Sequence, residues 1–140
     1  MAELKTTPGE QDARAFVAAI PDEGRRRDAG VIMELMARAT GQPPVMWGSS
    51  IVGFGHYHYA YASGREGDTM AVGFSPRKAA TTVYVVDGFD GYRDLLDRLG
   101  PHSTGKACLY LKRVVGDRGV DLDVLAELVR RSYASTTARD

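Results

Sequence analysis

The sequence lacks several features that would point to export or to a membrane. Its 140 residues include a single cysteine, Cys108, so no internal disulfide can form. No apolar run reaches the roughly 18 residues of a membrane-spanning helix, and no basic segment followed by a short apolar stretch marks a leader at the N-terminus. We therefore expect a cytoplasmic protein without a membrane partner.

Net charge is lacking as well. The 18 lysines and arginines are balanced by 18 aspartates and glutamates. A chain without net positive charge has no field that draws it non-specifically to nucleic acid, so nucleic acid is not expected as a partner. The length suits one core. We expect a single domain over residues 10–134, between a flexible N-terminal arm (1–9) and a flexible C-terminal tail (135–140).

The first half of the sequence contains two helical patterns. A helix over residues 12–20 ends before Pro21, and a second over residues 23–40 starts after the capping candidate Asp22 and stops before Gly41. In the second helix, apolar residues recur at spacings of three and four and predict one core-facing stripe. The stripe consists of Ala29, Ile32, Met33, Met36 and Ala39.

From residue 45 the pattern changes to short runs rich in β-branched and aromatic residues. The runs "IVGFGHYHYAYA", "TMAVGFS" and "TTVYVV" predict an antiparallel meander, and "KACLYLKR" predicts a further strand. Helices are expected near residues 90–98 and 121–133. Together these elements predict an α+β fold, in which N-terminal helices precede an antiparallel β-sheet of about four to five strands and further helices pack on that sheet.

Four segments carry a family resemblance. The strings "PPVMWGSSIVGFGHYHY", "GFSPRK", "LGPHSTGKACLYLKR" and "VDLDVLAELV" together resemble the YdhG-like family, domain of unknown function 1801. The resemblance runs from about Ile20 to Tyr133. It implies a small cytosolic α+β protein and no established activity or catalytic residue. Some bacterial relatives have been proposed as frataxin-like intracellular iron carriers.

Two histidines, His56 and His58, are expected on one face of a strand, because side chains alternate across it. Such a pair can bind a metal, but a closed zinc site needs four ligands and a catalytic one needs three. Only His102 and Cys108 remain as further soft ligands, and Glu66, in a predicted turn, lies too far along the chain for the cupin pattern. Local hydrogen bonding or solvent exposure is therefore the favoured interpretation.

The opposite face of that strand carries Tyr57, Tyr59 and Tyr61. Aromatic side chains of strands usually pack against helices, and core packing is the interpretation we favour here. A ligand groove or a contact between subunits is the alternative. Trp47 is likewise expected to be a packing anchor rather than a stacking platform.

A group of cations surrounds the predicted strands. Arg77 and Lys78 lie in a turn, while Lys106, Lys112 and Arg113 flank the strand "ACLYL". These charges either keep turns and sheet edges soluble or gather at one end of the sheet to bind an anion. The segment "STGKA" lacks the first glycine of a phosphate-binding loop, so nucleotide hydrolysis is not expected.

An acidic group suggests a different function. Asp90, Asp94 and Asp97 stand at i, i+4 and i+7 of a predicted helix, and Asp87 precedes it. Oxygen ligands suit hard cations such as ferrous iron, so an exposed carboxylate stripe is compatible with weak iron carriage. An ordinary solvated helix face would show the same pattern.

Catalysis has little support, because no G-x-S-x-G elbow is present and Cys108 lies inside an apolar strand. The leading hypothesis is a non-enzymatic domain that binds a small molecule or anion, with no cofactor. The alternatives are a weak iron carrier and an interaction module that forms a homodimer. The ligand-binding candidates of the leading hypothesis are Trp47, His56, His58, Arg77, Lys78 and Lys106.

Overall fold

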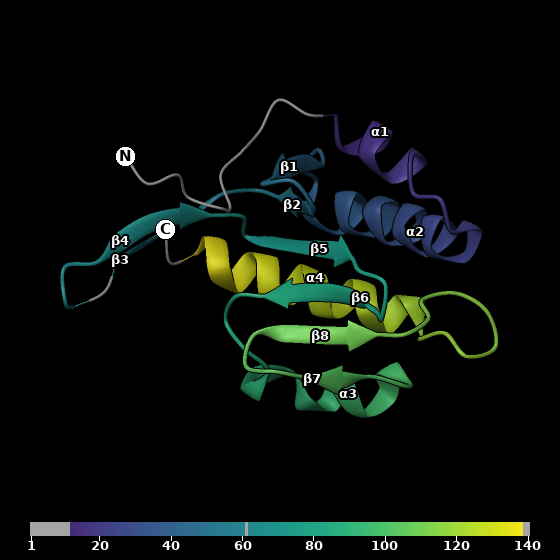
Figure 1. The fold of residues 1–140 in the computed structure, drawn as a ribbon. Coiled ribbons are helices and arrows are strands. Elements are labelled where there is room, and N and C mark those ends of the chain that lie inside the picture. The colour runs from purple at the N-terminus through teal and green to yellow at the C-terminus, as the bar shows by residue number, and fades with distance from the viewer. Residues whose placement is uncertain (1–11, 61, 139–140) are drawn as a thin grey trace.

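The computed structural model describes residues 12–60 and 62–138, so the predicted arm (1–9) lies outside the described residues. The described chain is α+β, as expected, with helices packed on a mostly antiparallel sheet (Figure 1). Its helical elements are α1 (Ala13–Ala18), α2 (Glu23–Thr40), the short 3-10 helix η1 (Asp90–Tyr92), α3 (Arg93–Leu99) and α4 (Leu122–Thr137). Its strands are β1 (Val45–Trp47), β2 (Ile51–Phe54), β3 (Tyr57–Ala60), β4 (Glu66–Thr69), β5 (Val72–Pro76), β6 (Thr81–Val85), β7 (Ser103–Thr104) and β8 (Cys108–Leu111).

The main sheet has six strands in the order β1-β2-β5-β6-β8-β7, and β3 pairs with β4 in a separate two-stranded ribbon. The expectation of four to five strands was too low. The short strands β1 and β7 were missed, because the pairing of β1 with β2 and of β7 with β8 defines them more than their own sequence does.

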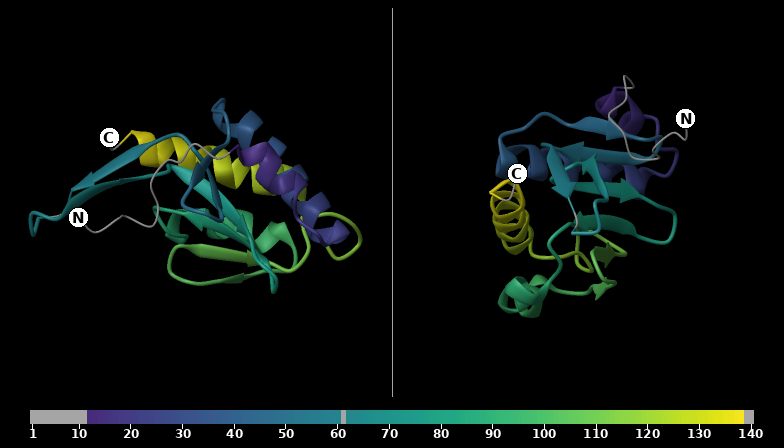
Figure 2. Two further views of the ribbon diagram at one scale, coloured as in Figure 1. Left: turned by 45° about the horizontal axis from the view of Figure 1, so that its top comes forward. Right: turned by 90° about the vertical axis from the view of Figure 1, so that its left-hand side faces the viewer.

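One long strand was predicted over residues 51–62, and that prediction is wrong. The chain turns at Gly55, whose φ of 75° lies in the left-handed region that favours glycine. As a result β2 stays in the main sheet, whereas β3 leaves it and forms the projecting β3–β4 hairpin (Figure 2).

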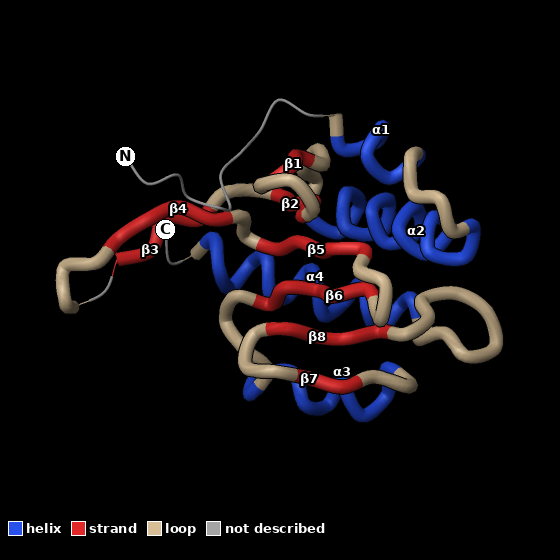
Figure 3. The backbone as a smooth tube through the Cα atoms, viewed as in Figure 1, coloured by secondary structure: helices blue, strands red, loops and turns tan. Residues whose placement is uncertain are grey.

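The helices cover one face of the sheet (Figure 3). α2 and α4 pack against each other and against the sheet, α1 packs on α2, and α3 packs on α4. Each fully buried leucine or phenylalanine contributes about 1.5–3 kcal/mol to stability. The fully buried side chains of this core include Ile32, Met36, Phe54, Phe74, Leu109, Leu111, Leu125 and Leu128.

The other face of the sheet is covered in part by Trp47. A Cβ atom on Gly53 would lie 2.4 Å from the Trp47 ring and 2.6 Å from Cβ of Met70, so glycine leaves the space that these two side chains occupy. Trp47 is only 3% exposed. Its predicted role as a packing anchor is confirmed.

The ends of the long helices follow their capping residues. Asp22 accepts a hydrogen bond from the Arg25 amide at the start of α2, which confirms the predicted cap, and Gly41 ends that helix. α4 starts after Asp121 and continues to Thr137, three residues into the segment that was expected to be a flexible tail. Thr136 is buried there, so the helix end belongs to the packed domain. None of the helices within the described ranges is long and apolar enough to cross a membrane.

Candidate functional site

The two histidines lie on either side of one carboxylate in the β3–β4 hairpin. Nδ1 of His58 lies 2.8 Å from Oδ1 of Asp68, and Nε2 of His56 lies 3.0 Å from the same oxygen. Nε2 of His58 lies 2.9 Å from Oε1 of Glu66, which belongs to β4 and not to a turn as predicted. The expected local hydrogen bonding of the histidines is confirmed.

These contacts shift two pKa values in opposite directions. The pKa of His58 is raised, first by its hydrogen bond to Asp68 and then by that to Glu66. The pKa of Asp68 is lowered, mainly by the same hydrogen bond to His58. Because an isolated two-stranded hairpin is marginally stable in water, these cross-strand pairs are among the contacts that hold this one together.

A metal site at the hairpin would need further ligands. His102 lies beside β7, at the edge of the sheet opposite β1, where its Nδ1 is 2.7 Å from the carbonyl oxygen of Gly100. Within residues 12–60 and 62–138, no three His, Cys, Asp or Glu side chains form a group that could hold a metal ion. The ring of His56 instead stacks on Trp47, with the ring centroids 6.4 Å apart.

Core packing was expected for the tyrosines of this hairpin, and that expectation is wrong for the two that the structure describes. Tyr57 and Tyr59 are half-buried on β3, outside the cluster of core side chains. Because the chain turns at Gly55, these two tyrosines lie in the separate β3–β4 ribbon and not in the main sheet that the helices cover. Tyr61 lies outside the described residues.

The predicted cluster of cations is split between the two ends of the sheet. Arg77 and Lys78 are exposed in the turn between β5 and β6, whereas Lys106 is exposed in the turn between β7 and β8. The antiparallel register pairs Thr81 with Leu111, which places the start of β6 beside the end of β8. Lys106, before β8, therefore lies at the end away from the other two. Since Trp47 is covered as well, the six predicted ligand-binding residues do not form one site.

Asp87 does not join an exposed stripe of carboxylates. Its carboxylate accepts a hydrogen bond of 2.8 Å from Oγ of Ser132 in α4 and a second one from the hydroxyl of Tyr92. Burial and the contact with Asp87 raise the pKa of Tyr92 to about 12. Asp87 is thus a link between the end of β6 and α4.

The other three aspartates are exposed on η1 and α3. Asp90 lies 3.5 Å from Arg93, and Asp94 lies 3.7 Å from Arg131 of α4. Asp97 has no ion pair among the described residues. The structure therefore does not gather the four predicted metal ligands into one cluster.

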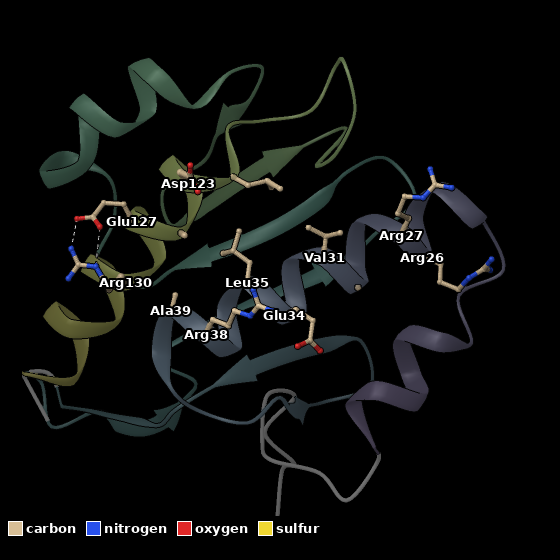
Figure 4. Close-up of a pocket in the computed structure, with 13 residues that line it drawn as sticks. Arg26, Arg27, Val31, Glu34, Leu35, Arg38, Ala39, Asp123, Glu127 and Arg130 are labelled. Carbon is tan, nitrogen blue, oxygen red and sulfur yellow. Dashed lines mark hydrogen bonds and ion pairs between the residues drawn. The ribbon is translucent and has the colours of Figure 1, made fainter.

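A groove of about 780 Å³ lies between α2 and α4, and we call it the α2–α4 groove (Figure 4). It lies on the side of the helices away from the sheet, because the buried faces of both helices point toward the sheet. Val31 and Leu35 extend from α2 toward α4 (Figure 4). The small and apolar residues that line the groove are Gly30, Val31, Leu35, Ala39, Leu122 and Ala126.

The groove lining carries four arginines and three acidic residues, so its positive excess is a single charge. Glu34 pairs with Arg14 at 2.5 Å, and Glu127 pairs with both Arg130 and Arg131. These contacts lower the pKa of each glutamate, so both carboxylates stay ionised and neutralised by arginine. The charged lining residues are Arg26, Arg27, Glu34, Arg38, Asp123, Glu127 and Arg130.

Arg38 is the cation best placed to receive a ligand. It lies at the Ala39 end of the groove, on the same side as Arg130 (Figure 4). Within the described part of the chain, Arg38 forms no ion pair with any acidic residue. Arg26 differs, because its guanidinium donates to the carbonyl oxygen of Ile20.

Sequence reasoning missed this groove, although the apolar residues that α2 contributes to it follow a recognisable spacing. Val31, Leu35 and Ala39 recur every four residues in α2 and form a second apolar stripe beside the buried one. Ala39 was predicted to belong to the core-facing stripe, yet it is only half-buried, as is Leu122 of α4. The partner stripe on α4 could be found only from the packing of the two helices.

Comparisons with protein-family models, with curated proteins and with solved structures give no match to this chain. The resemblance to the YdhG-like family therefore stays a prediction.

Proposed function

We propose that this protein is a non-enzymatic binding domain for a small amphipathic anion, and that the α2–α4 groove is its binding site. The observation that carries the proposal is the combination of an apolar floor with a rim whose glutamates are already paired with arginine. The groove volume of about 780 Å³ lies within the range of small-molecule sites, and such sites commonly lie between packed helices.

The ligand that fits this chemistry has an acyclic or cyclic apolar body and a terminal carboxylate. Its body would cover Val31, Leu35 and Leu122, which are half-buried and open to the groove. Its carboxylate would lie beside Arg38, where the planar guanidinium can donate two parallel hydrogen bonds. Charge-assisted hydrogen bonds of this type contribute about 1.5–3 kcal/mol.

The test compares ligands that share a body and differ in charge. Isothermal titration calorimetry with decanoate, decanol and decylammonium, all below micelle-forming concentrations, should give the order decanoate, then decanol, then decylammonium. In the Arg38→Gln variant, decanoate should lose about tenfold in affinity, since one charge-assisted contact is removed. The control is Arg98→Gln, an exposed arginine on α3, which should bind decanoate as the unchanged protein does.

Three results would overturn the proposal. The first is the absence of saturable decanoate binding. The second is equal affinity for decanol and decanoate, which would show that Arg38 has no role in binding. The third is an equal loss of decanoate affinity in Arg98→Gln, which would show a non-specific effect of surface charge. Light scattering at the same concentrations adds a fourth check, because a dimer that buries the groove without ligand would make a second copy the occupant.

A further inference from the structure

A second hollow, of about 630 Å³, lies at the β7 edge of the sheet, and we call it the β7-edge pocket. Three cations line it: Lys112, Arg113 and Arg118. No aspartate or glutamate is among its lining residues, and none of the three cations forms an ion pair within the described ranges. Positive charge without a counter-charge is what an anion site offers.

The backbone that carries these cations is fixed from inside the domain. Asp28 of α2, only 4% exposed, accepts hydrogen bonds from the amides of Val114 at 3.0 Å and Val115 at 3.3 Å. The Val120 amide donates back to the carbonyl of Val114, and the Asp121 amide donates to the carbonyl of Leu99. The backbone of the segment that follows β8 is therefore held at both ends, and Lys112, Arg113 and Arg118 extend from it as exposed side chains.

The chain also keeps room for one of these cations. A Cβ atom on Gly24 would lie 2.9 Å from Nη1 of Arg113, so the glycine lets the guanidinium lie against the first turn of α2. The nearby carboxylate of Asp22 is occupied with the helix cap and accepts from the Arg25 amide at 2.8 Å. It forms no ion pair with Arg113, whose charge stays available.

The Ser103 hydroxyl and the exposed ring of Tyr110 complete the pocket. Ser103 and Tyr110 are paired across β7 and β8, and both line the pocket together with His102. Tyr110 is 38% exposed, which makes it the one large apolar side chain on the described chain that is this open. Ala79 and Pro101 add an apolar wall.

We propose that the β7-edge pocket binds a small phosphate monoester that carries a ring. Three cations and the Ser103 hydroxyl suit a dianion with three acceptor oxygens better than a single carboxylate. The ring of the ligand would pack on Tyr110 and the apolar wall. This site shares no residue with the α2–α4 groove, so either proposal can fail without the other.

The test uses phenyl phosphate, with inorganic phosphate and benzoate as comparison ligands. In calorimetry at fixed ionic strength, phenyl phosphate should bind more tightly than either, and the amide signals of Ser103 and Tyr110 should shift in nuclear magnetic resonance spectra. The variant Lys112→Gln with Arg118→Gln should lose at least about tenfold in affinity, because charge-assisted contacts disappear. Tyr110→Ala should lose affinity for phenyl phosphate and leave that for inorganic phosphate unchanged.

The matched control is Lys106→Gln. This exposed lysine precedes the start of β8, whereas Lys112 follows its end. The control variant should bind phenyl phosphate as the unchanged protein does. An equal loss in Lys106→Gln, no saturable binding of phenyl phosphate, or tighter binding of benzoate would overturn the proposal. A single-stranded oligonucleotide that binds more tightly through the same cations, with a steep salt dependence, would replace it with a nucleic-acid contact. Unchanged thermal unfolding of each variant shows that the fold is intact.

Discussion

Asp87 illustrates how one side chain takes its role from distant neighbours. Its position before a predicted helix made it a candidate metal ligand, but Ser132, which lies 45 positions later in the chain, donates to its carboxylate. Sequence spacing cannot reveal such a partner. The outcome for the exposed Asp90, Asp94 and Asp97 is different, because the helical spacing correctly indicated that these carboxylates lie at the surface.

We expect Asp87→Ala to lower the free energy of unfolding by about 1–3 kcal/mol, since the hydroxyls of Tyr92 and Ser132 lose a charged acceptor. Urea denaturation measures the loss. Asp97→Asn is the control, because an exposed aspartate without an ion pair should change stability by less than about 0.5 kcal/mol. Equal effects of the two substitutions would show that Asp87 is no structural link.

Leu125 tests which face of α4 is buried in the core. It is fully buried, so Leu125→Ala should destabilise the protein by about 2–5 kcal/mol through lost transfer energy and the cavity that remains. Leu122→Ala, one turn earlier and only half-buried in the α2–α4 groove, should cost clearly less. A loss under about half a kcal/mol for Leu125→Ala would contradict the observed orientation of α4.

At the scale of elements, helices were easier to predict than strands. α2 follows its predicted bounds because an apolar period, an aspartate cap and a terminal glycine all agree, and each of these signals is local. The break between β2 and β3 depends on one backbone angle at Gly55, which alternation of side chains does not encode. Because of this angle, β3 with Tyr57 and Tyr59 lies outside the core.

The stability of the β3–β4 hairpin should depend on pH. The raised pKa of His58 means that its contribution is full below the usual value of 6.5 and is lost as pH rises through the raised value. The lowered pKa of Asp68 means that its contribution is full above the usual value of 3.8 and is lost as pH falls through the lowered value. The hairpin is therefore most stable between these two usual values.

Amide hydrogen exchange, corrected for the intrinsic pH dependence, measures this directly. Protection of the amides in β3 and β4 should fall as the pH rises above 6.5 and through the raised pKa of His58, while protection in β6 stays constant. His58→Gln should remove the pH dependence, since the replacement does not titrate. A pH-independent hairpin in the unchanged protein would show that the pairs of His58 with Asp68 and Glu66 contribute nothing to its stability.

At the scale of the whole molecule, the candidate sites arise between elements that are far apart in sequence. The α2–α4 groove joins residues near 30 with residues near 125, and the β7-edge pocket joins Tyr110 with the turn after β5. The predicted gathering of cations at one end of the sheet holds for Lys112 and Arg113, which follow β8 at the end beside Arg77 and Lys78, and is wrong for Lys106. Only the antiparallel register shows that the end of β8, and not its start, lies beside the turn that holds Arg77 and Lys78.

We propose that the α2–α4 groove binds the apolar body of an anionic ligand. The most direct measurement is calorimetry with hexanoate, octanoate and decanoate, on the unchanged protein and on Leu35→Asp. Each added methylene that is buried contributes about 0.8 kcal/mol, so affinity should rise about fourfold per methylene in the unchanged protein. In Leu35→Asp, which places a charge among the apolar lining residues, that rise should disappear. An affinity that does not depend on chain length, or the same dependence in both proteins, would contradict the account.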